Sequence, residues 1–346
     1  MLLFMPRVIR QLIKLKLGDR PEFDHASLNE LTRDKSNVPT MGGVMIMSCV
    51  AVTMLLLADL SNFYIRMAFV CLFYLTALGG VDDWLKLTSK RKGVSRDGLK
   101  SWEKFLFQIA LGVLLGSYIF SHGNSNFAVL SPLVGEGSLP AYNILNVPFY
   151  KEGVSLTPIA FMVVTVIVMT GSSNAVNLTD GMDGLASGCV ALCVLVFAIL
   201  TYIVGTEELA ARLLFPHIPR GGELVVTCGA ILGACLGFLW YNCHPAKVFM
   251  GDTGSLPLGG LIGYVAIVTR QELMLLIVGG VFVMEAVSVI LQVGYFKWTR
   301  GRRLFRCAPI HHHFHLGGWS ESQTVVRFWL LAAMFAACGL ATVKLR

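Results

Sequence analysis

A polar stretch between two long apolar runs holds residues whose types and spacing suit chemistry. It reads NAVNLTDGMDGLA (residues 174–186) and carries Asn177, Asp180 and Asp183 with no basic residue beside them. Carboxylate, amide and hydroxyl oxygens are hard ligands that suit a magnesium ion carrying substrate phosphates. The glycines predict a turn between two helices, and an Asx-rich capped turn would explain the same residues. The stretch alone leaves both interpretations open.

A pair of adjacent carboxylates, Asp82 and Asp83, occurs in GGVDDWLK, where we expect an apolar span to end. Lys86 follows Asp82 by one helical turn, and Gly79 and Gly80 would let the backbone distort. Two adjacent carboxylates at a membrane surface can provide a base or face a cation together. A charge cluster that ends a helix is the alternative explanation.

A third carboxylate, Asp252, lies between two glycines in FMGDTGS, three residues after Phe249. The motif therefore offers one metal-seeking carboxylate and one aromatic ring on which a base could stack. A plain Gly-Asp turn would explain Asp252 but would not require the aromatic ring.

Histidines gather in APIHHHFH, which includes His311, His312 and His313 and follows an arginine-rich run. Adjacent imidazoles cannot all point the same way, so hydrogen bonding to phosphate or sugar oxygens suits them better than a zinc site. The nearby arginines add fork-shaped phosphate donors, although a basic patch that binds anionic lipid would have the same composition.

Glu285 is the one acid that we place well inside a membrane helix. Because burial of a charge in lipid is costly, such a residue is a functional hypothesis by default. A neutral, hydrogen-bonded structural role is the equal alternative, and an ion or proton transporter would use the same residue.

The composition indicates an all-α polytopic membrane protein with one domain, residues 1–346. Hydrophobic residues make up 55% of the chain and charged residues only 14%. The net charge of +7 does not indicate nucleic-acid binding, because the basic residues lie between apolar runs. Nine spans are predicted, at about 44–60, 63–81, 105–120, 156–173, 185–204, 224–241, 255–269, 273–293 and 328–343.

The loops between these spans predict the orientation. Three quarters of the 28 basic residues fall on one side, which we take as cytoplasmic, and every motif above falls on that side. Residues 1–43 form a cytoplasmic or interfacial segment that begins with a helix too charged to span. Residues 121–155 form an extracytoplasmic loop that is long enough for a small hairpin.

Taken together, PTMGG (39–43), DDxxK (82–86), NAVNLTDGMDGLA, FMGDTGS (249–255) and APIHHH resemble the phospho-N-acetylmuramoyl-pentapeptide transferase family of polyprenyl-phosphate sugar-phosphate transferases. The similarity covers nearly the whole chain in order. It implies a magnesium-dependent transfer of phospho-MurNAc-pentapeptide from UDP-MurNAc-pentapeptide to undecaprenyl phosphate, giving lipid I and UMP. The implied setting is the bacterial inner membrane with the active site facing the cytoplasm, and a homodimer is left open.

The resemblance also assigns residues. It implies that Asp252 binds Mg²⁺, with Asp180 as a second candidate ligand, and that Asp82 and Asp83 activate the lipid phosphate. Further catalytic positions are Lys86, His311, His312 and His313. The implied substrate-binding positions are Lys35, Thr40, Lys104, Asn177, Asp180, Asp183 and Phe249.

Two departures from the family pattern stand out. The chain begins where the family's first of ten spans is ending, so nine spans are expected here and an upstream start would restore the tenth. Asn37 and Val38 replace the usual glycine and threonine before PTMGG. A transferase of the hexosamine-phosphate branch is the near alternative, whereas a transporter is disfavoured because the acids cluster at one surface and no internal repeat is found.

Overall fold

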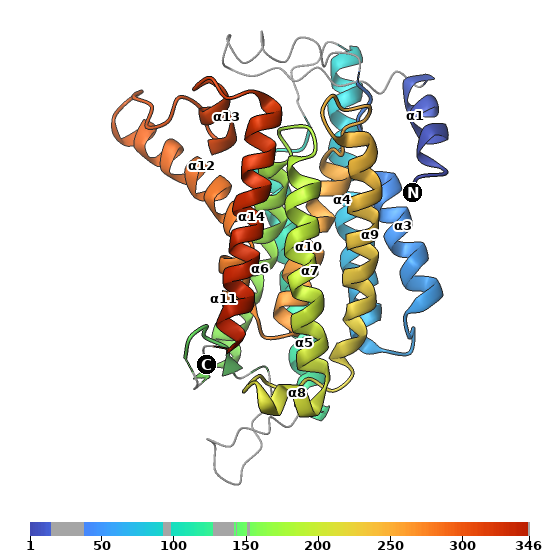
Figure 1. Cartoon of the computed structure of the whole chain (residues 1–346), viewed down its shortest axis with the longest axis vertical. Coiled ribbons are helices and arrows are strands. Elements are labelled where there is room, and N and C mark those ends of the chain that lie inside the picture. Colours follow the sequence, from blue (N-terminus) through green and yellow to red (C-terminus); the bar gives the residue numbers. More distant parts are fainter. Residues whose placement is uncertain (15–37, 93–97, 127–141, 143, 151–152, 345–346) are drawn as a thin grey trace.

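Apolar stretches in a membrane form helices because a backbone in lipid must satisfy its own hydrogen bonds. The computed structural model describes residues 1–14, 38–92, 98–126, 142, 144–150 and 153–344 (Figure 1). Within these residues, seven helices are long and apolar enough to cross a membrane. They are α4 (Phe63–Lys92), α5 (Ser101–Asn126), α6 (Pro158–Thr179), α7 (Leu185–Gly205), α9 (Leu224–Asn242), α12 (Gly280–Trp298) and α14 (Glu321–Lys344).

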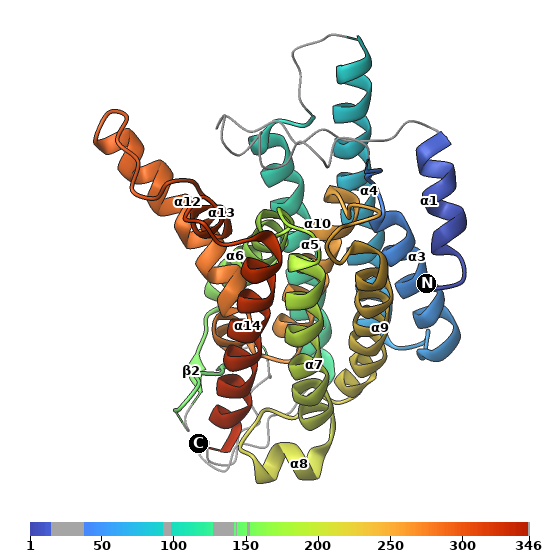
Figure 2. The same cartoon turned by 45° about the horizontal axis from the view of Figure 1, so that its top comes forward.

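Two shorter apolar helices, α3 (Gly43–Leu57) and α10 (Asp252–Val268), bring the described spans to the predicted nine. The all-α polytopic fold is therefore confirmed. One predicted span, 273–293, is divided at Gly279 into α11 (Glu272–Val278) and α12, which leans away from the bundle (Figure 2). The described residues also form the short helices α1 (Met5–Lys14), α8 (Glu207–Arg212), η3 (Gly221–Glu223) and α13 (Ile310–His315).

A small antiparallel hairpin lies in the predicted extracytoplasmic loop. Strand β1 (Ile144–Leu145) pairs with β2 (Val154–Ser155), and Ile144 lies opposite Ser155. Helix α5 continues to Asn126, beyond the predicted start of this loop at residue 121, and residues 127–141 lie outside the described part of the chain.

Helix α10 forms the centre of the bundle. All 17 of its residues are buried, and it packs against α3, α4, α6 and α7. A Cβ atom on Gly259 or Gly263 would collide with Ser172 of α6, so these glycines allow the two helices to approach closely. Because protein rather than lipid surrounds α10, it does not need the length of an ordinary membrane span.

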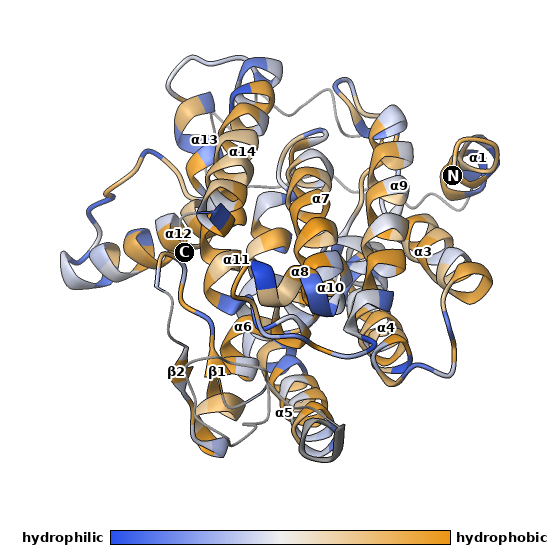
Figure 3. Cartoon of the chain, turned by 60° about the horizontal axis from the view of Figure 1, so that its bottom comes forward, coloured by the Kyte–Doolittle hydropathy of each residue, from blue (hydrophilic) through white to orange (hydrophobic). Residues whose placement is uncertain are grey.

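The outer helices carry apolar residues along most of their length, whereas hydrophilic residues concentrate at helix ends and loops (Figure 3). The loop between α6 and α7, helix α13 and the C-terminal half of α4 lie at the same end of the bundle, the upper end in Figure 1. The acidic and histidine motifs are therefore collected at one end, as the loop pattern predicts.

Candidate active site

Two sequence motifs run side by side at the N-terminus of α10. The backbone N–H of Phe249 donates to Pro39 O at 2.8 Å, and the N–H of Gly42 donates to Phe249 O at 2.8 Å. The N–H of Gly43 completes the set by donating to Met250 O at 2.9 Å. These bonds hold FMGDTGS against PTMGG and place Asp252 at the start of its helix.

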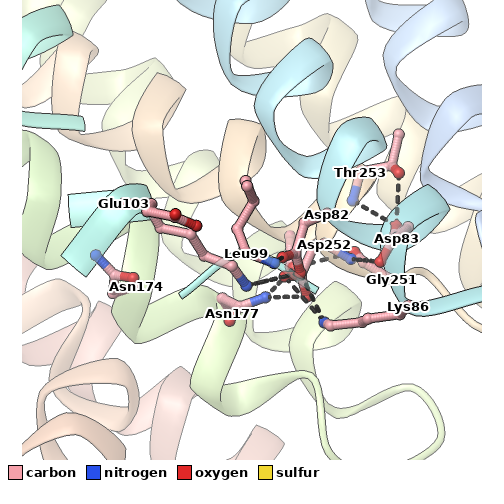
Figure 4. Close-up of polar contacts among 12 residues, drawn as sticks. Asp82, Asp83, Lys86, Leu99, Glu103, Asn174, Asn177, Gly251, Asp252 and Thr253 are labelled. Carbon is pink, nitrogen blue, oxygen red and sulfur yellow. Dashed lines mark hydrogen bonds and ion pairs between the residues drawn. The ribbon is translucent and has the colours of Figure 1, made fainter. Parts of the chain in front are cut away.

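Asp83 of α4 caps the N-terminus of α10 from a neighbouring helix. Its Oδ1 accepts the N–H of Asp252 at 3.1 Å, and its Oδ2 accepts the N–H of Thr253 at 2.9 Å and the Thr253 hydroxyl at 2.6 Å (Figure 4). A carboxylate is favoured here because the first amides of a helix lack partners within the helix and carry partial positive charge. Asp83 therefore positions the chain that carries Asp252.

Asp252 and Asp82 share two lysines. Lys104 Nζ lies 2.7 Å from Oδ2 of each carboxylate, and Lys86 Nζ lies 2.8 Å from Asp82 and 3.2 Å from Asp252. The other oxygen of Asp82 accepts the N–H of Leu99 at 2.7 Å. Residues from α4, α5 and α10 thus meet at one point (Figure 4).

The charges of this cluster fit a divalent cation. Asp82, Asp83 and Asp252 are all buried and present carboxylate oxygens within 4.8 Å of one another. Among the described residues, two lysines lie between these three carboxylates, so this group of five side chains carries more acidic than basic residues. Buried hard oxygen donors in such excess are the ligands that Mg²⁺ prefers.

The NAVNLTDGMDGLA stretch joins the cluster through Asn177. Its Nδ2 donates to Asp252 Oδ1 and to the Ser255 hydroxyl, both at 2.8 Å. Asp180 follows the end of α6 and receives a backbone hydrogen bond from Gly251. Burial and the negative charges of Asp252 and Asp83 raise the pKa of Asp180 to about 7. A cation at this place would reverse that effect and favour the ionised carboxylate.

Asp183 connects two loops instead of entering the acidic cluster. Its Oδ2 lies 3.0 Å from His244 Nδ1 and accepts the N–H of Ala246 at 3.1 Å, while its own N–H donates to Glu321 at 3.0 Å. The loop that leads to Phe249 is thereby tied to the loop after α6. The predicted contact of Asp183 with the nucleotide stays a prediction.

The three histidines of α13 do not all point the same way, as expected for adjacent imidazoles. His311 Nδ1 lies 3.1 Å from Glu285 of α12, with both side chains buried. His313 Nδ1 accepts the N–H of Arg306 at 3.1 Å. His311 and His312 both approach Gly181, at 2.5 and 3.5 Å from the position that a Cβ on Gly181 would occupy.

Other predicted positions lie around α10. Thr40 is buried, and its hydroxyl would be 3.1 Å from a Cβ on Gly251, a residue whose φ of +72° favours glycine. Phe249 is half-buried beside Pro39. Lys35 lies outside the described residues, so the structure does not place it.

Two interpretations of α4 are wrong. The alternative that Asp82 and Asp83 form a charge cluster at a helix end fails, because the apolar span reaches Thr88 and the helix continues to Lys92, supported by the ion pair of Asp82 with Lys86 one turn on. Gly79 does not distort the backbone, because α4 is continuous through it. A Cβ on Gly79 would collide with the carbonyl group of Asp252, so this glycine is needed for close packing.

The sequence analysis did not predict some residues of the site. The Thr253 hydroxyl donates to Asp83, and the Ser255 hydroxyl accepts from Asn177. Nearby, Asn174 donates to Gln108, which in turn donates to Ser173. The polar types in DTGS directly after Asp252 could have indicated the first two residues. The sequence around Gln108 could not have indicated its role, because both of its partners lie on a different helix, α6.

Comparison with known proteins agrees with this geometry. Residues 65–270 match the model of the family described as Glycosyl transferase family 4. The chain is also 45% identical over 343 residues to a phospho-N-acetylmuramoyl-pentapeptide-transferase from Desulfatibacillum aliphaticivorans, covering 99% of this chain and 89% of the relative. The chain belongs to the phospho-N-acetylmuramoyl-pentapeptide-transferase family.

Membership of the phospho-N-acetylmuramoyl-pentapeptide-transferase family makes this chain a multi-pass membrane transferase of peptidoglycan synthesis. It removes the support for an ion transporter built around Glu285. Enzymes that transfer phosphate groups neutralise phosphate charge with metal ions and basic side chains, and a cluster of carboxylates and lysines is suited to that role.

Proposed function

We propose that this protein transfers phospho-MurNAc-pentapeptide from UDP-MurNAc-pentapeptide to undecaprenyl phosphate with the aid of Mg²⁺, at the cytoplasmic face of the bacterial inner membrane. The products are lipid I and UMP. The observation that carries this proposal is the buried cluster of three carboxylates and two lysines at the end of the bundle. The name of the relative supports the choice of phospho-N-acetylmuramoyl-pentapeptide as the transferred group.

The reaction exchanges one phosphate bond for another. An oxygen of undecaprenyl phosphate attacks the sugar-linked phosphorus of the donor, and the bond from that phosphorus to the oxygen of UMP breaks. UMP leaves with the bonding electron pair. Because a phosphate monoester with a second pKa of about 6 is largely ionised at neutral pH, the attack needs no obligatory protein base.

Asp252 would hold the metal, with Asp180 as the second candidate ligand and Asp82 within reach of the same point. Bound magnesium supplies charge neutralisation for the diphosphate and for departing UMP. Asp83 contributes by holding the α10 N-terminus, since both of its oxygens accept hydrogen bonds from that helix. Lys86 and Lys104 would bind phosphate oxygens and hold the two substrates in line.

An apolar pocket supports a lipid acceptor. It lies between α6, α10, α11 and α12 and is lined by residues such as Val168, Ile262, Leu275 and Phe282. The pocket follows α6 as far as Val176, the residue before Asn177. A polyprenyl chain in this pocket would have its phosphate near the acidic cluster.

The assay combines purified protein in detergent with UDP-MurNAc-pentapeptide, undecaprenyl phosphate and Mg²⁺, and it measures UMP. We expect UMP release that stops on addition of EDTA and returns with excess Mg²⁺. Full activity in EDTA would remove the metal from the mechanism. UDP-N-acetylglucosamine as the donor provides the control for the hexosamine-phosphate branch, and its preferential use would overturn the proposed substrate.

A further inference from the structure

Glu285 is a fully buried acid that the reaction described above does not use. It lies in α12, and its Oε2 lies 3.1 Å from Nδ1 of His311 in α13. Both side chains have no solvent exposure. An isolated carboxylate at such a place would be costly, so the contact with the imidazole explains how α12 can retain it.

The second nitrogen of His311 points toward the loop between α6 and α7. A Cβ on Gly181 would stand 2.5 Å from His311 Nε2, which places this nitrogen against the residue after Asp180. Among the residues that the structure describes, the buried Nε2 has no polar partner, and the 3.1 Å approach of Nδ1 to Glu285 is an ion-pair contact that lacks hydrogen-bond geometry. A buried polar atom without a partner is costly unless a ligand or water completes it.

The two contacts give the imidazole a direction. Its Nδ1 edge faces Glu285 of α12, and its Nε2 edge faces Gly181, the residue after Asp180. A carboxylate that binds one ring nitrogen of a histidine orients the ring and selects what the other nitrogen can do. The ring of His312, 4.1 Å away, packs against His311.

We propose that Glu285 is a positioning residue that holds His311 so that Nε2 meets an oxygen of the sugar-phosphate donor beside Gly181. This inference rests on the proposed function, because that function supplies the oxygen. Two other groups lie near Glu285. Cys189 of α7 is close enough to Glu285 for an electrostatic interaction, and on α12 itself the Ser288 hydroxyl donates to the backbone carbonyl oxygen of Glu285 at 2.7 Å.

Gln292 offers a matched control on the same helix. It lies two turns after Glu285, and its Oε1 accepts the N–H groups of Leu304 and Phe305 at 3.0 and 2.8 Å. It therefore also ties α12 to the segment that leads to α13, without a contact to His311. A purely structural tether would be disturbed in both Glu285→Gln and Gln292→Leu.

The test is a double-mutant cycle with Glu285→Gln, His311→Gln and the double variant, using UMP release with donor concentration varied. We expect Glu285→Gln to lower turnover about 10- to 100-fold, the range for loss of a group that orients a ligating imidazole. We expect little further loss when it is added to His311→Gln, and partial recovery in Glu285→Asp. Independent, multiplying losses would overturn the proposal, as would an equal loss in Gln292→Leu.

A second measurement does not depend on activity. In protein labelled with ¹⁵N-histidine, the imidazole signals of His311, assigned through His311→Gln, should shift in Glu285→Gln and stay in place in Gln292→Leu. Unchanged signals in Glu285→Gln would refute the positioning role even in a well-folded variant. If the wild type released no UMP, the proposed function would fail, and the imidazole signals would still decide whether Glu285 orients His311.

Discussion

One added methyl group at Gly79 tests whether close packing of α4 on α10 sets the geometry of the acidic cluster. A Cβ there would collide with the carbonyl oxygen of Asp252, would lie 2.5 Å from its carbonyl carbon and would lie 2.8 Å from Thr253 N. The adjacent Gly80 is a matched control. Its Cβ would lie 3.9 Å or more from the nearest atoms, which belong to Thr253.

The two alanine substitutions are expected to change the stability of the protein in opposite directions. An alanine in a helix is favoured over glycine by about 1 kcal/mol, which applies to both positions. Overpacking at Gly79 costs about 1 to 3 kcal/mol, so its net effect ranges from neutral to a loss of about 2 kcal/mol. Relief of the collision requires the start of α10 to move by about 1 Å, and a displacement of that size can lower turnover about 100-fold.

The assay compares UMP release, its Mg²⁺ dependence and thermal unfolding in detergent for both alanine variants. We expect Gly79→Ala to lose most of its turnover and to need more Mg²⁺, because Asp252 moves relative to Asp82. Gly80→Ala should keep its turnover and unfold at the same temperature or higher. Equal turnover in the two variants would refute the idea that this contact sets the site.

Three further outcomes test single side chains. Asp252→Asn should abolish most turnover and regain part of it at high Mg²⁺, since it keeps the shape but loses the charge; an unchanged Mg²⁺ requirement would count against a ligand role. Asp83→Asn should lower both turnover and stability, with the free energy of unfolding reduced by about 1.5 to 3 kcal/mol, the contribution of a hydrogen bond to a charged group. Lost turnover at unchanged stability would point to direct action of Asp83 on the substrate. Phe249→Ala should weaken donor binding by about 1 to 3 kcal/mol, with Phe249→Trp better tolerated, if the ring stacks on uracil; equal affinity would leave Phe249 a packing residue.

The sequence by itself determined the helices and the end of the bundle at which the motifs lie. Long apolar runs leave a chain in lipid no choice but helix, so the nine spans could be read directly. The basic residues indicated which loops share a side. Because residues 82–86, 174–186 and 249–255 border spans on one side, their meeting at one end of the bundle followed from topology.

Only the tertiary structure decided what each side chain does there. Asp82 and Asp83 are adjacent in the sequence, yet one pairs with Lys86 and Lys104 while the other caps α10. Successive residues on a helix point about 100° apart, so neighbours in the chain face different partners. The pairing of Glu285 with His311 was equally hidden, since a contact between two helices depends on packing angles and small residues that no local pattern records.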